Sequence, residues 1–500
     1  MGTLRNTLLL ILILSLCSKG IGFLRDLMIT NYVGFNAKTD AIFVSISIVT
    51  LIFSVFNTTI RTTFSPLFSS RYLKEKAAVL EEYNNIQNLF LLPFIIISLT
   101  VYLFPGFIIS IFTPGLNEDS FSYSVNFLKI LSFMLIFYGF YYLSTGFLQS
   151  IKIYKTVEIG TIINNFTIIA CIAIFFQKYN IYSVVIGYVI GSILQFMYAQ
   201  WVLRKKTNIK FKPKIRFRDK NFNEYISTSK YIVFGSLVTQ LTVISDKFVA
   251  SFFDAGSITA LHYASTVKNL PLNIVILVVT NVLFTNLSIL KEESKEKFDK
   301  LITLQVKYLL YLICPIIVIF ICYSEELIRL LFYRGAFTEQ GIEMTSQALV
   351  AYAIGLFFWV IKEVYTKAAY ASKNIKIPFY TSILSLFINL IFNVILGYFL
   401  GHIGIALATS LSIAVNCFFL MNKLEKNGIV ENKKEMLTIT MKNIIFLFIV
   451  IFFINILDEF LFFHFDYMIR IIIGSIIIFL IYISCAKLLG IEINKFMRGK

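Results

Sequence analysis

The sequence predicts an all-α polytopic membrane protein with about fourteen transmembrane helices. Of its residues, 58% are hydrophobic and only 15% are charged, and the mean hydropathy is +0.79. So few charged side chains could not cover that much apolar surface in water, so the chain must use lipid as its solvent. Apolar segments of about twenty residues, the length of a membrane-spanning helix, recur along the whole chain. The alternating pattern of barrel strands is absent.

The predicted helices follow one another at short intervals along the chain. The first can extend beyond its apolar run, through Arg25 and Asp26 towards Val33. We interpret it as a retained helix and not a signal peptide, because no small-residue cleavage motif follows the apolar run. The apolar segments cover residues 7–23, 41–64, 86–112, 124–148, 157–177, 181–203, 229–253, 258–290, 303–322, 344–370, 378–400, 402–421, 438–457 and 468–489.

Loop charge predicts that both termini face the cytoplasm. The loops 113–123 and 457–467 contain no Lys or Arg, and they fall on the opposite side of the membrane from the basic loops. The net charge of +17 comes mainly from those basic loops, so it does not indicate nucleic-acid binding. The basic loops cover residues 71–76, 204–220, 291–300 and 422–434.

Two lobes of six helices each, in a pseudo-twofold arrangement, account for most of the chain. The segment "RDLMITNYVGFNAKTDAIFVS" (25–45) aligns weakly with "SDKFVASFFDAGSITALHYAS" (245–265), which indicates a duplicated unit. Transporters built from parallel repeats place the substrate site between the halves. The expected organisation is an N-terminal lobe at 1–205, a basic cytoplasmic loop at 206–228, a C-terminal lobe at 229–421, a cytoplasmic linker at 422–437 and two further helices at 438–500.

Ionisable side chains inside the predicted helices are the first candidates for function. Each costs roughly 2.5–3.5 kcal/mol at the centre of a membrane helix, so it normally faces a cavity or a partner. Cations that face a cavity would suit a phosphate-bearing ligand. Simpler interpretations remain open, because Arg25 and Asp26 can pair with each other and Arg61 and Lys38 can reach the membrane interface. The candidate substrate-binding residues are Lys19, Arg25, Asp26, Asp40, Arg61 and Lys268.

Polar residues in the second lobe suggest a cation site. Asn389 and Asn393 are four residues apart and so share a helix face, and Thr409 lies in the next predicted helix. These side chains could instead form hydrogen bonds between helices. With Asp246 supplying negative charge, they could also be oxygen ligands of a small hard cation such as sodium.

The sequence gives no sign of catalytic or redox chemistry. The cysteines all lie in apolar segments without a CxxC pair, and the histidines (His262, His402 and His464) are widely dispersed. No DxD, HExxH, GxSxG or P-loop motif occurs. We therefore expect a protein that is not an enzyme and that uses no cofactor other than a possible sodium ion.

Three segments resemble the MurJ/MviN family of lipid II flippases, within the multidrug/oligosaccharidyl-lipid/polysaccharide exporter superfamily. They are "SKGIGFLRDLMITNYVGFNAKTDAIFV" (18–44), "LLFYRGAFTEQGIEMTSQALVAYAIGL" (330–356) and "KAAYASKNIKIPFYTSILSLFINLIFNVIL" (367–396). The resemblance implies two lobes around a cationic cavity in the bacterial cytoplasmic membrane. It also implies alternating access, with an undecaprenyl-pyrophosphate-linked peptidoglycan precursor as substrate and membrane lipid as surroundings.

The family's site residues carry over only in part. Lys19 and Arg25 match its first-helix cations, and Asp40 matches its acidic position at the start of helix two. The segment "LIFSVF" (51–56) lacks the family's Arg pair, and "ASTVKNLP" (264–271) lacks its Asp and Arg. A flippase for another lipid-linked oligosaccharide therefore remains an alternative, and a small-molecule antiporter, which generally has twelve helices, is less favoured.

The resemblance also bears on the possible sodium site, since some members of the family bind sodium in the second lobe. Asn389 and Thr409 match that pattern, Asp246 is a plausible match for one of its carboxylates, and Asn393 stands where a second carboxylate is usual. One carboxylate fewer implies weaker cation binding.

Overall fold

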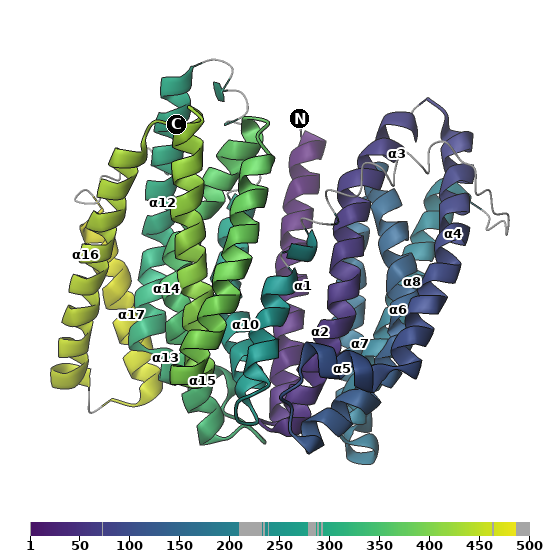
Figure 1. Cartoon of the computed structure of the whole chain (residues 1–500), viewed down its shortest axis with the longest axis horizontal. Coiled ribbons are helices and arrows are strands. Elements are labelled where there is room, and N and C mark those ends of the chain that lie inside the picture. Colours follow the sequence, from purple (N-terminus) through teal and green to yellow (C-terminus); the bar gives the residue numbers. More distant parts are fainter. Residues whose placement is uncertain are drawn as a thin grey trace. The chain divides into compact units, whose positions relative to one another are not determined.

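The computed structural model describes residues 2–72, 74–209, 233, 236–238, 240–278, 287, 290–291, 294–462 and 465–486. Over these residues the chain is helical and contains no strand, which confirms the predicted fold class (Figure 1). In the described part, 10 helices are long and apolar enough to cross a membrane. The total of about fourteen stays a prediction, and most of the basic loop at 206–228 and His464 lie outside the described residues.

The chain divides into two compact units. The first comprises Met1–Ile258 together with Arg334–Phe337, and the second comprises Thr259–Tyr333 together with Thr338–Lys500. The first unit thus includes part of the segment 229–421 that the sequence analysis assigned to the C-terminal lobe. The lobe boundaries proposed from the helix count stay a prediction, because compact units are defined by contacts and not by topology.

In the first unit, long helices pack both with distant partners, α1 against α7 and α2 against α6, and with a neighbour in sequence, α7 against α8. The first predicted span extends past Arg25 and Asp26 as far as Val33, as expected. The elements are α1 (Gly2–Val33), α2 (Ala37–Thr59), the π-helical turn η1 (Ile60–Phe64), α3 (Ser65–Tyr72), α4 (Lys76–Leu103), α5 (Pro105–Phe112), α6 (Glu118–Ser150), α7 (Lys155–Tyr179) and α8 (Tyr182–Thr207).

Local chemistry explains where several of these helices begin and end. The Asn36 side chain accepts hydrogen bonds from the amides of Lys38 and Thr39 and so caps the N-terminus of α2. The single span predicted at 86–112 is two helices, because Pro105 disfavours helical geometry at the residue before it, and α4 ends just before Phe104. Asn208 ends α8 with a left-handed φ of 56°.

The second unit contains one unusually long element. In α15, Gly401 has φ 57° and ψ −136°, so the 51 residues form two helices that meet between the predicted spans 378–400 and 402–421. Glycine reaches this backbone conformation without a Cβ penalty. The elements are α10 (Ser257–Val278), α12 (Lys295–Cys322), α13 (Ser324–Phe332), α14 (Glu339–Ala371), α15 (Lys376–Lys426), α16 (Lys433–Leu457), the π-helical turn η3 (Asp458–Phe462) and α17 (Tyr467–Ser484).

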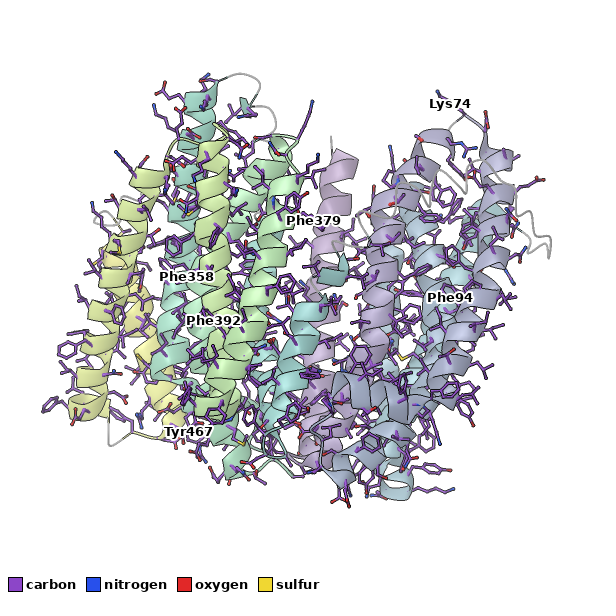
Figure 2. All side chains as sticks on the ribbon, in the orientation of Figure 1. Lys74, Phe94, Phe358, Phe379, Phe392 and Tyr467 are labelled. Atoms are coloured by element: carbon purple, nitrogen blue, oxygen red, sulfur yellow. The ribbon has the colours of Figure 1, made fainter. Side chains whose placement is uncertain are left out.

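Apolar side chains point outward as well as inward, as a lipid-embedded protein requires. Phe399 and Phe452 are 73% and 70% exposed, and both lie on helices long and apolar enough to cross a membrane. Figure 2 shows Phe94 in the middle of α4 and Lys74 at the end of the unit, in the turn before that helix. Charge at the helix ends and apolar surface between them is the distribution of a membrane-spanning helix.

The turn between α1 and α2 holds the segment Arg334–Phe337 by close backbone contact. The amide of Ala336 donates to the carbonyl of Asn31 (3.0 Å), and the rings of Phe35 and Phe337 meet edge to face at 5.6 Å. Gly335 has φ +62°, and a Cβ there would lie 2.2 Å from the Asn31 carbonyl oxygen. Only glycine therefore fits at this position.

We expect Gly335→Ala to lower the midpoint of thermal unfolding of the detergent-purified protein. The substitution combines the cost of a positive φ, about 1–2 kcal/mol for an L-residue, with a backbone clash. Gly428→Ala is the matched control, because Gly428 also has a positive φ (+64°) but no atom lies within 4 Å of its Cβ position. Equal shifts for the two variants would contradict the tight contact at Gly335.

Candidate functional site

The charges of α1 are held by side chains from α7 and α8. The Nε and Nη2 of Arg25 donate to Oδ1 of Asp26 (3.0 and 2.8 Å), and its Nη1 donates to Oδ1 of Asn165 (2.9 Å). The guanidinium also lies 5.6 Å from the centre of the Tyr188 ring. Arg25 and Asp26 therefore do pair, as the simpler interpretation held, and the pair is also tied to two other helices.

A second group of charges surrounds Glu158, in the first turn of α7. Glu158 lies close enough to Lys19 and Arg61 for its charge to interact with both of theirs, and it lies beside Ser18. Sequence reasoning selected Lys19 and Arg61 but missed Glu158, because a single acid at a helix start has no distinguishing pattern. Together the two groups bring three cations and two carboxylates onto α1, η1 and α7.

Arg61 lies in the π-helical turn that interrupts the second predicted span. Its side chain is exposed, and the turn closes back onto the helix through the Ser65 amide, which bonds to the carbonyl of Ile60. A π-helical turn widens the helix locally, and such turns are frequent at functional sites. The polar stretch "NTTIRTTFSP" is the sequence signal for this irregularity.

Tyrosines and amides line the same part of the unit. The Nδ2 of Asn164 donates to the hydroxyl of Tyr138 (2.6 Å), and the Tyr141 hydroxyl donates to the carbonyl of Val157 (3.0 Å). Adjacent buried amides at Asn164 and Asn165, inside the apolar run 157–177, were an available signal that the sequence analysis did not use. Such amides normally bond between helices, and here they contact the residues around Arg25.

Asp40 is buried at the start of α2 and makes a contact specific to this fold. Its Oδ2 accepts a hydrogen bond from the backbone amide of Gly256, and its charge acts on Lys247. The Nζ of Lys247 in turn donates to the carbonyl of Phe43 (2.9 Å) and to the hydroxyl of Ser47. The acid and the lysine thus fasten residues 240–258 to α2 within the first unit.

Lys268, the last of the predicted binding residues, and Lys38, predicted to lie at the interface, each lie against a tyrosine ring. Lys268, on α10 in the second unit, lies with its Nζ 4.1 Å from the centre of the Tyr352 ring, which is a cation–π contact. Lys38, which we expected at the interface, lies with its Nζ 5.4 Å from the Tyr123 ring beside an open cavity of ≈ 380 Å³.

Three of the four proposed cation ligands meet in the second unit. The Nδ2 of Asn393 donates to Oδ1 of Asn389 (3.2 Å), and Nδ2 of Asn389 lies 3.5 Å from the Thr409 hydroxyl oxygen. Both asparagines are fully buried. Asp246 belongs to the first unit, so this set is not assembled within one unit. Among the described residues, no group of three or more His, Cys, Asp or Glu side chains could hold a metal ion.

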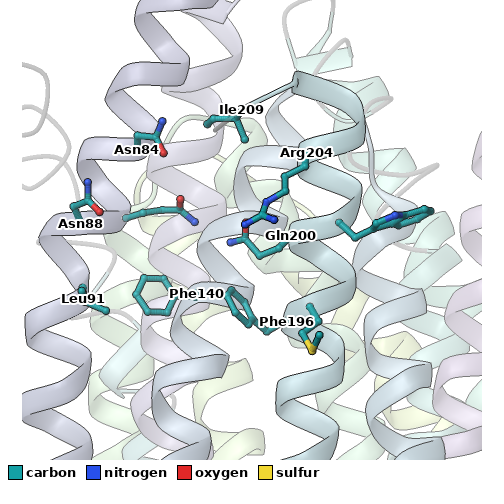
Figure 3. A pocket seen from close by; sticks show the side chains of 11 residues that line it. Asn84, Asn88, Leu91, Phe140, Phe196, Gln200, Arg204 and Ile209 are labelled. Atoms are coloured by element: carbon teal, nitrogen blue, oxygen red, sulfur yellow. The ribbon is translucent and has the colours of Figure 1, made fainter. Parts of the chain in front are cut away.

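A cavity of ≈ 530 Å³ lies between α4, α6 and α8 (Figure 3). None of the residues predicted from the sequence to bind substrate or cation lines it. Its lining combines amide side chains with aromatic rings and one arginine, Arg204. Amides at Asn84, Gln87 and Asn88 follow a helical spacing that the sequence shows, but they lie just before or at the start of the predicted span 86–112 and were not selected.

Known proteins provide an independent comparison. Residues 29–476 match the family model described as lipid II flippase MurJ. The chain is 30% identical over 469 residues to the lipid II flippase MurJ of Thermosipho africanus, covering 93% of each chain. It is 26% identical over 513 residues to the probable lipid II flippase MurJ of Buchnera aphidicola from Acyrthosiphon pisum, covering 99% of each.

Solved structures agree. The fold matches a structure titled "Lipid II flippase MurJ, inward closed conformation" with a TM-score of 0.80 and 26% identity, covering 96% of this chain and 100% of that one. An inward-facing multidrug resistance transporter of the MATE family matches with a TM-score of 0.71 at 10% identity, which shows a shared fold alone. A family model that matches nearly the whole length, together with these relatives, shows that the chain belongs to the lipid II flippase MurJ family.

Proposed function

We propose that this protein moves lipid II, the undecaprenyl-pyrophosphate-linked peptidoglycan precursor, across the bacterial cytoplasmic membrane by alternating access, for cell-wall synthesis. The observation that carries the proposal is the charged group on α1, η1 and α7 in a chain that matches the flippase family over residues 29–476. Both termini are proposed to face the cytoplasm, since the basic loops alternate with loops that lack Lys and Arg.

The charged group is suited to a diphosphate. Arg25 uses three of the five guanidinium N–H donors on Asp26 and Asn165, so two remain for a ligand oxygen. Lys19, Arg61 and the nearby Glu158 together carry one net positive charge. Carboxylates reduce the cost of keeping cations in a membrane, and a diphosphate can compete with them because its oxygens form strong charge-assisted hydrogen bonds.

One observation favours a second candidate, a flippase for another lipid-linked oligosaccharide. The stretch 51–56 carries no cation, and its aromatic residues pack against α4 instead, with Phe53 and Phe56 at 6.3 and 5.1 Å from the Phe94 ring. The corresponding part of α10 has Ser265 and Thr266, and the Thr266 hydroxyl donates to the carbonyl of His262 (2.9 Å). Fewer cations would accommodate a less acidic headgroup.

Complementation separates the two candidates. Expression of this chain in a strain depleted of its own lipid II flippase is expected to restore growth and cell shape. A parallel strain that lacks the flippase for a capsule or O-antigen unit provides the comparison. Rescue of only the second strain would replace lipid II with another lipid-linked glycan, and rescue of neither would contradict flippase function.

Arg25→Ala and Asp40→Ala are expected to abolish complementation at equal membrane levels, and Lys38→Ala is expected to leave it intact. Arg25→Ala removes the cation proposed to meet the diphosphate, and Asp40→Ala removes the acceptor of the Gly256 amide. Lys38 contacts only an aromatic ring beside an open cavity among the interactions described for its side chain. Full activity of Arg25→Ala would contradict the diphosphate-binding role.

We also propose that sodium binds weakly at Asn389, Asn393 and Thr409, with Asp246 supplying the carboxylate. Transport is then expected to slow when sodium is replaced by potassium or choline at fixed membrane potential, and Asp246→Asn is expected to remove the difference. An unchanged rate in both experiments would favour interhelical hydrogen bonding by these residues, with the membrane potential as the driving force.

A further inference from the structure

One face of α4 and one face of α8 supply most of the lining of the cavity between α4, α6 and α8. On α4, Asn84, Asn88 and Leu91 share one helix face, since residues three and four apart are neighbours. On α8, Phe196, Gln200 and Arg204 repeat every four residues. Its volume of ≈ 530 Å³ falls in the range of small-molecule sites, about 300–1,000 Å³.

The polar and apolar ends of the cavity are separate. Figure 3 shows Asn84 and Arg204 at one end and Leu91 and Phe196 at the other. The polar end belongs to the start of α4 and the end of α8, which adjoin the basic loops 71–76 and 204–220. An amphiphile with its charged head at the membrane surface and its chain towards the interior has the same polarity.

The mouth of the cavity carries large apolar side chains that are exposed. Trp201 and Met197 are 57% and 58% exposed, and both line the cavity. In a membrane such side chains contact lipid, and tryptophan is enriched at the level of the headgroups. The Nζ of Lys205 lies 4.9 Å from the Trp201 ring, which adds a second cation at that level.

The polar end offers hydrogen-bond donors suited to an anion. Arg204 forms no ion pair with any side chain that the structure describes, and it is exposed. The Nε2 of Gln200 donates one hydrogen bond, to the Ser144 hydroxyl (3.0 Å), and the Nε2 of Gln87 donates one, to the Tyr83 hydroxyl (2.8 Å). Each amide nitrogen has a second N–H, which can be offered to a ligand.

We propose that this cavity binds an anionic phospholipid from the leaflet on the side of the basic loops. Its phosphate accepts hydrogen bonds from Arg204 and from the amide of Gln200, and an acyl chain lies along Phe196, Met197 and Leu91. Basic pockets between membrane helices bind anionic headgroups in this way. The site is separate from the charged group on α1, η1 and α7, so the inference does not depend on the transported substrate.

Fluorescence quenching tests the proposal with a reporter that the cavity already contains. The chain has 2 tryptophans, Trp201 and Trp359, so in the Trp359→Phe variant Trp201 is the only tryptophan, and it is excited selectively over the tyrosines. The Trp359→Phe protein, which is the parent of the variants below, is reconstituted in phosphatidylcholine vesicles. The vesicles contain either brominated phosphatidylglycerol or brominated phosphatidylcholine. One arginine beside an anionic headgroup strengthens binding about fivefold. Brominated phosphatidylglycerol is therefore expected to quench Trp201 at a correspondingly lower mole fraction than brominated phosphatidylcholine.

Arg204→Gln in the same background is expected to remove most of that preference. Lys206→Gln is the matched control, because it removes the same charge from the same helix turn but does not line the cavity. It is expected to keep the preference. The proposal is overturned if the two lipids quench Trp201 equally in the Trp359→Phe protein. It is also overturned if Lys206→Gln lowers the preference for phosphatidylglycerol as much as Arg204→Gln does, or more. Either result would indicate unspecific attraction of anionic lipid to the basic end of α8.

Discussion

Inside a bilayer no water is available to bond a polar group, and the structure depends on this constraint throughout. Helices satisfy the backbone within each segment. Hydroxyl side chains in the helices bond back to carbonyls one turn earlier, as Thr30 does to Asp26 (2.7 Å) and Thr167 to Ile163 (2.7 Å). The polar atoms that remain must find partners on neighbouring helices, and these partners determine which helices pack together.

The same constraint determines how charge is kept in the first unit. Arg25 is paired with Asp26 and bonded to Asn165, and the charge of Glu158 offsets part of the charge of Lys19 and Arg61 without a direct ion pair. A charge without a partner would be costly there, so a ligand that takes one of these cations must supply oxygens of comparable strength. A diphosphate meets this requirement. The charged group is therefore stable without a ligand, and the binding that we propose would proceed by exchange of partners.

Segments that are distant in sequence are fastened to the first unit by backbone contacts. Asp40 accepts the Gly256 amide, and Ala336 donates to the Asn31 carbonyl. The contact of Asp40 is buried, and the contact of Ala336 lies beside the turn between α1 and α2, where Gly34, with φ +82°, leaves room for the Ala336 carbonyl. Asp40 thus has a structural role that residue type alone did not suggest.

The sequence by itself determined the fold class, the place of most helices and the break at Gly401 between two predicted spans, because hydropathy and backbone preference act over neighbouring residues. The break before Pro105 was not predicted, since the apolar run 86–112 continues through it. It also indicated Lys19, Arg25 and Arg61 as unusual cations. Only the tertiary structure decided that Glu158, Asn165 and Tyr188 surround them, that Asp40 binds a glycine amide, and that amides and Arg204 enclose a cavity. These contacts join residues far apart in the chain, and no local pattern specifies which helix faces meet.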